Sequence, residues 1–146
     1  MSDDAFPYTS VRSAILNEGL ETVGEQGGCV GVFGYTQLRK IVFPSTLQLL
    51  GHRAFCMSDR LRCVEFRKGS RLGAMGQYIF YDCDNLRTIS LPEGLWYIDS
   101  GCFSTSGIKE IIIPNSVEVI ESNAFYYCHA LRRVVFKEDS TLKKIG

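Results

Sequence analysis

One segment, IKEIIIPNSVEVIESNAFYYCHA from Ile108 to Ala130, recurs in varied form along the whole chain. Repeats begin at residues 11, 38, 61, 86, 108 and 131, so the five complete intervals are 27, 23, 25, 22 and 23 residues. A unit this small cannot bury its own apolar face, and stacking one unit on the next solves that problem. The period therefore predicts a solenoid. Its most regular column is a phenylalanine spine: Phe33, Phe55, Phe80, Phe103 and Phe125.

The repeat also predicts how the chain is organised. We expect one domain over residues 1–146, which divides into a tail of a preceding coil (1–10), five repeats (11–37, 38–60, 61–85, 86–107 and 108–130) and a partial repeat (131–146). Solenoids normally close their ends with polar capping units. Neither end has such a unit, which favours a slice of a longer array or self-association through the uncapped ends.

Each repeat is expected to open with a short strand. In LRTISL, Leu86 to Leu91, apolar residues alternate with Thr88 and Ser90, which is the period of a strand with one buried face. Stacked strands must then be parallel, about 4.8 Å apart. The second apolar pair, Val117 and Ile120 in the repeat that starts at residue 108, fits an extended segment or a tight turn. The SNAF segment after it predicts a short helix or 3₁₀ turn.

The run L-x-x-I-x-I-P, V-x-x-I, A-F-x-x-C resembles the BspA-like, or treponemal, class of leucine-rich repeats, most fully over Ile108–Cys128. Asn17, Arg67 and Lys137 depart from it by replacing the proline. The resemblance implies an α/β, right-handed solenoid with a parallel sheet on its concave face and short strands, turns or 3₁₀/helical turns on the other side. It also implies a non-catalytic binding protein of the cell surface or a secreted one, with a role in adhesion to host matrix. An intracellular scaffold or assembly module is the alternative.

Composition and motifs narrow the function classes. The formal net charge is zero, so bulk charge indicates no nucleic acid partner, and no apolar run is long enough to insert in a membrane. The acidic N-terminus shows no apolar signal-peptide core. Nucleotide-binding and nucleophile-elbow motifs are absent, and His52 and His129 occupy non-equivalent repeat positions. We expect no enzyme, no cofactor and no metal site.

The six cysteines are expected to be mostly or wholly free thiols. A disulfide needs Cα atoms within about 7 Å, which only one column in adjacent coils would provide. Cys83 and Cys128 share a column but lie two coils apart, and no adjacent in-register pair exists. We expect Cys83, Cys102 and Cys128 to be buried, Cys63 to lie on a strand and Cys29 to lie in an inserted loop. Free thiols and the missing signal favour the intracellular alternative.

Two repeat positions on or next to the strands would stack into lines along the solenoid, and both are candidate partner-binding surfaces. The second residue of every repeat is basic, which predicts a basic stripe along one rim of the sheet that could receive an acidic protein segment or a sulfated glycan. The alternative is a solvated edge that Asp59 and Asp84 neutralise. The stripe comprises Arg12, Arg39, Arg62, Arg87, Lys109 and Arg132. The outward strand position is apolar in four repeats, at Ile15, Val42, Ile112 and Val135. These residues predict exposed apolar patches that could contact a protein. The alternative is that they are there only because such residues favour strands.

Aromatic residues form the third candidate surface. Trp96 and Tyr97 fall between two core positions, and further tyrosines occupy the turns after the phenylalanine column. Trp and Tyr are common anchors of protein interfaces. The alternative is packing against the adjacent coil. The tyrosines of the turns are Tyr81, Tyr126 and Tyr127.

Overall fold

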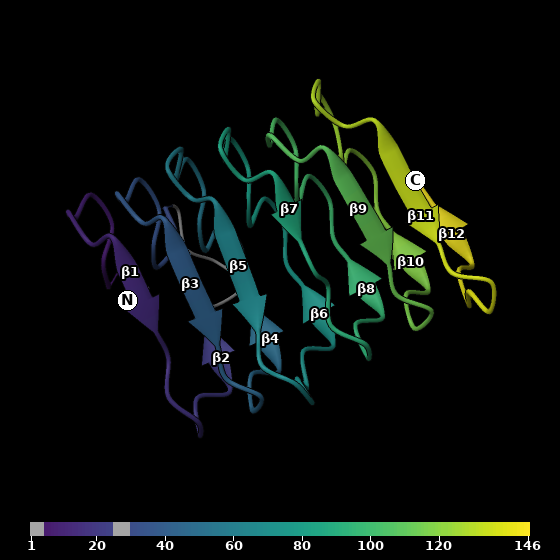
Figure 1. The fold of residues 1–146 in the computed structure, drawn as a ribbon, viewed down its shortest axis with the longest axis horizontal. Coiled ribbons are helices and arrows are strands. Elements are labelled where there is room, and N and C mark those ends of the chain that lie inside the picture. Colours follow the sequence, from purple (N-terminus) through teal and green to yellow (C-terminus); the bar gives the residue numbers. More distant parts are fainter. Residues whose placement is uncertain (1–4, 25–29) are drawn as a thin grey trace.

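The computed structural model describes residues 5–24 and 30–146, and within them the chain forms a parallel β-solenoid of about six turns (Figure 1). Each turn carries one strand at the front and a two-residue strand behind it. The front strands are β1 (Ser13–Ile15), β3 (Lys40–Phe43), β5 (Cys63–Phe66), β7 (Thr88–Ile89), β9 (Glu110–Ile113) and β11 (Arg133–Phe136). The rear strands are β2 (Thr22–Val23), β4 (Leu49–Leu50), β6 (Ala74–Met75), β8 (Tyr97–Ile98), β10 (Val119–Ile120) and β12 (Lys144–Ile145).

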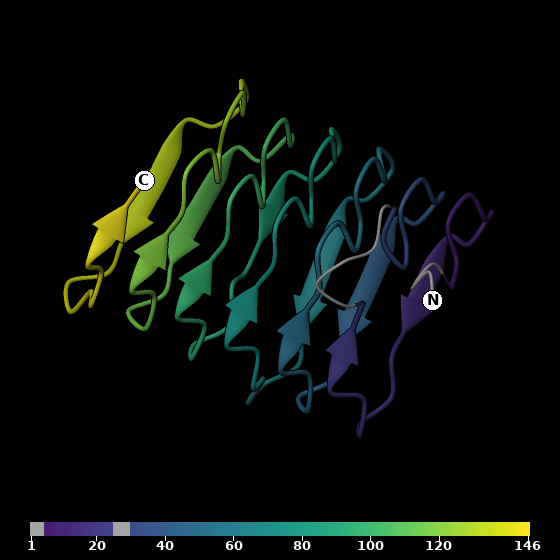
Figure 2. The same cartoon turned by 180° about the vertical axis from the view of Figure 1, so that it is seen from behind.

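Every strand pair is parallel, as the repeat predicts. At the front, β1-β3-β5-β7 form a four-stranded sheet and β9 pairs with β11, while a single bridge from Ser90 to Ile112 joins the two groups. The rear strands form one six-stranded sheet in the order β12-β10-β8-β6-β4-β2, which Figure 2 shows from behind. Equivalent repeat positions face each other throughout; Ile41, for example, pairs with Val64.

The apolar columns build the core between the two sheets. Leu38, Ile41 and Leu47 of one repeat are fully buried. The phenylalanine spine is stacked, with ring centroids 5.3 Å apart for Phe33 and Phe55 and 5.4 Å apart for Phe80 and Phe103. The predicted in-register stack is thus confirmed.

The third side of each coil consists of turns, and the described residues contain no helix. The helical part of the expected α/β class is therefore not confirmed. The reason lies in the backbone hydrogen bonds. The amides of Phe55 and Met57 donate to the next coil, to Ile79 O (3.0 Å) and Tyr81 O (2.8 Å). Amides that bond between coils cannot form the i to i−4 ladder of a helix.

Backbone conformation on this turn side also repeats. The residue two before the spine Phe and the residue two after it both have positive φ, which is uncommon outside glycine. The first column contains Arg53 (56°), Tyr78 (55°), Gly101 (64°) and Asn123 (60°), and the second contains Tyr35 (55°), Met57 (57°), Asp82 (59°), Thr105 (56°) and Tyr127 (53°). Each coil thereby makes the same two corners, which fixes where the side chains between them point.

A column of small polar residues and cysteines bonds to the carbonyls of the spine. The Ser58 hydroxyl donates to Phe33 O (2.7 Å), and the thiols of Cys83 and Cys128 donate to Phe55 O (3.2 Å) and Phe103 O (3.0 Å). Each bond joins one coil to the preceding one. Serine and cysteine are therefore interchangeable in this column because both can donate to the same acceptor.

The prediction of free thiols is confirmed for the five described cysteines, while Cys29 lies outside the described residues. Cys83 and Cys102 are fully buried, and burial raises the pKa of both thiols well above its usual range. Cys128 was expected to be buried as well but is only half-buried. Its thiol bonds Phe103 O and lies 3.6 Å from the Ser106 hydroxyl, both on the preceding coil, so its burial comes from that side.

Ser58→Ala is expected to lower the free energy of unfolding by about 1–2 kcal/mol, because a fully buried hydroxyl that bonds Phe33 O and lies 3.3 Å from Thr36 Oγ1 is lost. Ser58→Cys is expected to cost less, since a thiol fills the same role at Cys83. Urea unfolding followed by circular dichroism measures both. Equal losses for alanine and cysteine would show that the inter-coil hydrogen bond does not contribute.

Candidate binding faces

The basic residues at the second repeat position form a continuous column on the rim of the front sheet. Their backbones are hydrogen-bonded from coil to coil, with Arg39 N to Arg12 O at 2.8 Å and Arg132 N to Lys109 O at 2.9 Å. All six side chains are exposed. Adjacent members are about one strand spacing, 4.8 Å, apart along the backbone. The structure therefore places the six cations in one line.

No ion pair joins this column to a carboxylate of residues 5–24 or 30–146. Neither Asp59 nor Asp84 forms an ion pair with a member of the column. The charged residues on the strands pair with one another, Lys40 with Glu65 at 2.8 Å and Arg133 with Glu110 at 3.3 Å. One member of the column, Arg87, donates a hydrogen bond to Gly107 O at 3.2 Å. Among the described residues, the column thus has no carboxylate in direct contact.

The outward strand residues lie beside this column and form two apolar patches. Ile15 pairs with Val42, and Ile112 pairs with Val135. Ile15 is 68% exposed and Ile112 48% exposed. Glu65 and Ser90 separate the patches on the intervening coils.

A hollow of about 370 Å³ opens next to Ile112, where β7 is only two residues long and the front sheet is nearly interrupted. Ser90 and Pro114 line it, and the ion pair between Lys137 and Glu93 crosses from one wall to the other. The front face thus combines a cationic rim, apolar patches and a concavity.

The structure separates the aromatic residues that the sequence grouped. Trp96 and Tyr97 lie on the rear side, where they line a hollow of about 230 Å³ together with His52. A Cβ on Gly73 of the preceding coil would lie 3.1 Å from Trp96 Nε1, so the indole packs on that glycine and is still 50% exposed. Burial, with Asp99 next in effect, raises the pKa of Tyr97. Trp96 therefore packs on the adjacent coil, as the alternative interpretation expects, and half of its surface is exposed; its role as an interface anchor stays a prediction.

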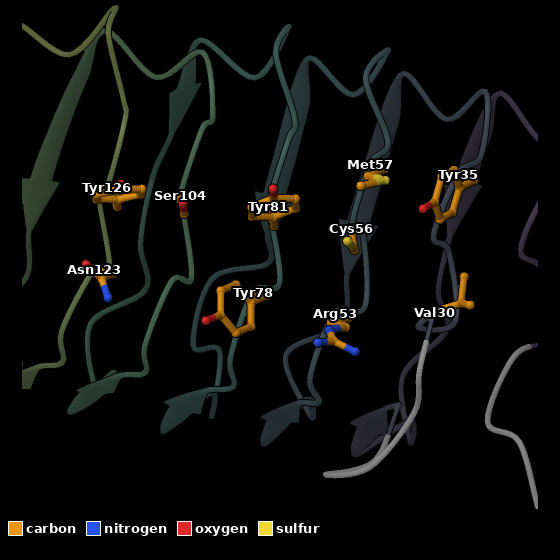
Figure 3. A pocket seen from close by; sticks show the side chains of 10 residues that line it. All are labelled: Val30, Tyr35, Arg53, Cys56, Met57, Tyr78, Tyr81, Ser104, Asn123 and Tyr126. Carbon is orange, nitrogen blue, oxygen red and sulfur yellow. The ribbon is translucent and has the colours of Figure 1, made fainter.

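The turn side carries a groove of about 710 Å³ that crosses five coils (Figure 3). Tyr81 and Tyr126 from the predicted set lie in its upper row, with Met57 and Tyr35 continuing that row. Tyr127 does not line it. Burial, followed by the neighbouring Tyr8, raises the pKa of Tyr35, so its hydroxyl keeps its proton.

Sequence reasoning missed most of this groove. Its other residues include Arg53, Tyr78, Ser104 and Asn123. The spine would have located them, since each of these residues directly follows a spine phenylalanine or lies two before one. These positions are not among the apolar columns of the repeat. They can be found in the sequence as the residues two before and directly after each spine phenylalanine.

Strands stacked in parallel with an apolar ladder inside and binding-competent faces outside define a leucine-rich-repeat solenoid. A family model for the BspA type leucine rich repeat region matches residues 1–132 in six copies. The chain belongs to this BspA-type family. Proteins built from leucine-rich repeats generally serve in interactions with other proteins. No curated protein sequence matches the chain significantly.

Solved structures show the same fold. A leucine-rich repeat protein of Bacteroides ovatus is 25% identical with a TM-score of 0.74, over 85% of this chain and 33% of its own. A leucine rich cell surface protein of Faecalibacterium prausnitzii is 22% identical with a TM-score of 0.77, over 97% and 38%. A T. pallidum leucine rich repeat protein is 21% identical with a TM-score of 0.57, over 84% and 68%. The chain spans about a third of the first two proteins.

Residues 5–24 and 30–146 contain neither a membrane-crossing helix nor a metal-binding cluster. None of their segments is a helix of the length and apolarity that a membrane crossing requires. No group of three or more His, Cys, Asp or Glu residues in this part of the chain is placed to hold a metal ion.

Proposed function

We propose that the chain is a non-catalytic module that binds a protein partner through its front sheet, with an acidic segment of the partner against the basic column. The observation that carries the proposal is the line of six exposed cations without a carboxylate partner among the described residues. Positive surfaces attract and orient negative ligands. The apolar patches at Ile15 and Ile112 favour a protein over a sulfated glycan, because apolar exposed surface is typical of protein contacts.

Family membership supports surface adhesion or matrix recognition as the setting of this binding. A scaffold or assembly module inside the cell is the second candidate, and the free thiols of the five described cysteines favour it, since reducing compartments keep thiols unpaired. Fractionation of cells that express the intact protein distinguishes the two.

Core columns are exposed at both ends of the solenoid. Phe6 is 44% exposed at one end, and Phe136 and Ile145 are 42% and 64% exposed at the other. Association through these ends, with further coils or a second copy, remains part of the proposal. Sedimentation at increasing protein concentration tests it.

Reversal of two central charges, Arg62→Glu with Arg87→Glu, is expected to weaken binding of an oligoglutamate peptide about tenfold without unfolding the protein. Exposed charge pairs are worth up to about 1 kcal/mol each, and reversal replaces attraction by repulsion at two positions. Fluorescence anisotropy of the labelled peptide, repeated over a salt series, measures the effect. Heparin serves as the sulfated-glycan probe in a parallel titration.

Lys68→Glu with Arg71→Glu is the matched control, because it changes the net charge equally from exposed positions beyond the other end of β5. The proposal requires the column variant to lose much more affinity than this control. Binding that is insensitive to salt, or equal in the two variants, would refute it. Heparin binding without peptide binding would assign the column to a glycan.

A further inference from the structure

Tyrosine side chains shape the groove on the turn side. Tyr81 and Tyr126 project from the upper row, each directly after a spine phenylalanine (Figure 3). Tyr78 lies below Tyr81 with its ring nearly perpendicular, at 81° and 5.9 Å between centroids. The Tyr78 ring covers Gly101, where a Cβ would lie 2.3 Å from Tyr78 Cε1. Tyrosine rings therefore form both a wall and part of the floor.

Small residues keep the groove open between these rings. Cys56 and Ser104 occupy the same repeat position as Tyr81 and Tyr126, on the alternate coils, and both are buried. From Cys56 to Tyr126, small and large side chains thus alternate along the column, while the first coil has Gly34 at this position. The result is a channel parallel to the stacking axis, to which this column contributes a tyrosine ring on the third coil and another on the fifth.

The spacing of the rings suits one backbone conformation. Two coils correspond to about 9.6 Å at the strand spacing of about 4.8 Å. A polyproline II helix repeats every three residues, or about 9.3 Å at about 3.1 Å per residue. Successive turns of such a helix would present the same side to Tyr81 and Tyr126. The five coils span about 19 Å, which accommodates about six residues of that helix.

The polar groups of the groove also suit a segment in the polyproline II conformation. Its described lining residues offer tyrosine hydroxyls, the Asn123 amide and the Arg53 guanidinium, and they include no carboxylate. Polyproline II has no internal hydrogen bonds, and proline offers only a carbonyl acceptor. Donors in the groove therefore meet acceptors on the peptide. The tyrosine and serine hydroxyls and the Asn123 amide oxygen also accept, so hydrogen bonding alone does not distinguish this peptide from a sugar chain, and the spacing of the rings carries that choice.

The positive charge of the groove favours an acidic residue in the ligand. Arg53 is the one charged residue among the described residues that line the groove, and its guanidinium carbon lies 5.8 Å from the centroid of the Tyr78 ring. This contact holds the cation in the second of the five coils, one coil in from Val30 and Tyr35. An acidic side chain at the matching position of the ligand would lie beside the guanidinium, where a charge-assisted hydrogen bond can form.

We propose that the turn-side groove binds a proline-rich segment of a partner protein in the polyproline II conformation, with an acidic residue next to Arg53. Aromatic-lined grooves that recognise this conformation use the same logic, because the ligand is pre-ordered and loses little entropy on binding. The site is independent of the front sheet, so each proposal is tested by its own variants.

The test uses the peptide Glu-Pro-Pro-Leu-Pro-Pro-Leu-Pro-Pro, titrated by isothermal calorimetry. Saturable binding is expected, together with loss of binding when glycine and serine replace the prolines and a weaker affinity when lysine replaces the glutamate. Tyr126→Ala is expected to weaken binding about tenfold, as truncation of an aromatic anchor does. Tyr126 is 52% exposed, so the variant should fold.

Trp96→Ala is the matched control, because Trp96 is an aromatic residue that is 50% exposed but lies on the rear side and does not line the groove. Its affinity should stay within about twofold of the original. Absence of saturable binding, or equal affinities for the Tyr126 and Trp96 variants, would overturn the proposal. So would binding of an N-acetylglucosamine oligomer through Tyr126 in place of the peptide.

Discussion

Phe80→Ala is expected to lower the free energy of unfolding by about 3–5 kcal/mol, which is a large part of the total stability of a domain of this size. Phe80 is fully buried at the middle of the spine and stacks on Phe55 at 5.6 Å and on Phe103 at 5.4 Å. Its removal leaves a cavity between two coils that hydrogen bonds hold at a fixed spacing, so the site cannot collapse to fill it.

Because the core of each coil packs mainly against its two neighbours, the same cavity should also weaken the coupling between the two halves of the solenoid. The unfolding transition is therefore expected to broaden as well as to shift. Guanidinium unfolding followed by circular dichroism measures both the midpoint and the slope.

Phe6→Ala is the matched control for this experiment. Phe6 occupies the same column at the N-terminal end, but it is 44% exposed and stacks on one ring only, Phe33 at 5.2 Å. Its loss should cost about 1 kcal/mol or less. If the two variants were destabilised equally, the spine would not be the element that holds the coils together.

Gly107→Ala is expected to lower the free energy of unfolding by about 3 kcal/mol, the upper part of the range for overpacking. The unit 86–107 is the shortest complete repeat, at 22 residues, and its chain passes close to the preceding coil. The Gly107 amide donates to Cys83 O at 3.1 Å. An added Cβ would lie 2.0 Å from Asp84 O, a backbone atom that no side-chain rotation can move.

Gly69→Ala separates this steric effect from the conformational preference of glycine. Gly69 has a φ of 78°, and an added Cβ would meet no atom within 4 Å. Its replacement should cost about 1–2 kcal/mol, from the left-handed conformation alone. Thermal unfolding monitored by circular dichroism compares the two variants. A loss at Gly107 no greater than that at Gly69 would contradict the close approach of the two coils.

The basic column illustrates how much of the candidate sites the sequence could predict. Equivalent positions stack when the apolar columns are in register, so the line from Arg12 to Arg132 followed from counting alone. Its ion pairing did not, because Glu65 pairs with Lys40 and Glu110 with Arg133 across coils, and no described carboxylate forms an ion pair with the column. Such pairings depend on side-chain reach between residues more than 20 positions apart.

The aromatic set shows the opposite case. Trp96 and Tyr126 looked alike in the sequence, as large side chains that the core does not need. The structure puts Trp96 on the rear side and Tyr126 on the turn side, in different hollows. The spacing put them at different repeat positions, Trp96 after Leu95 and Tyr126 after the spine residue Phe125, but it did not show which side of the coil each position faces. The sides of a coil are set by its corners, and those corners are the residues with positive φ.

The amino-acid sequence alone determined the parallel stack, its register and its single apolar core, because recurring apolar columns can be buried together in only one way. The tertiary structure decided the form of the turns and of the hollows between side chains. Alternate amides of the turn side bond to the next coil, which leaves no helical ladder, and large and small residues such as Tyr81 and Ser104 alternate over the coils from Cys56 to Tyr126. Both outcomes depend on contacts with neighbouring coils, which become visible only once the coils are stacked.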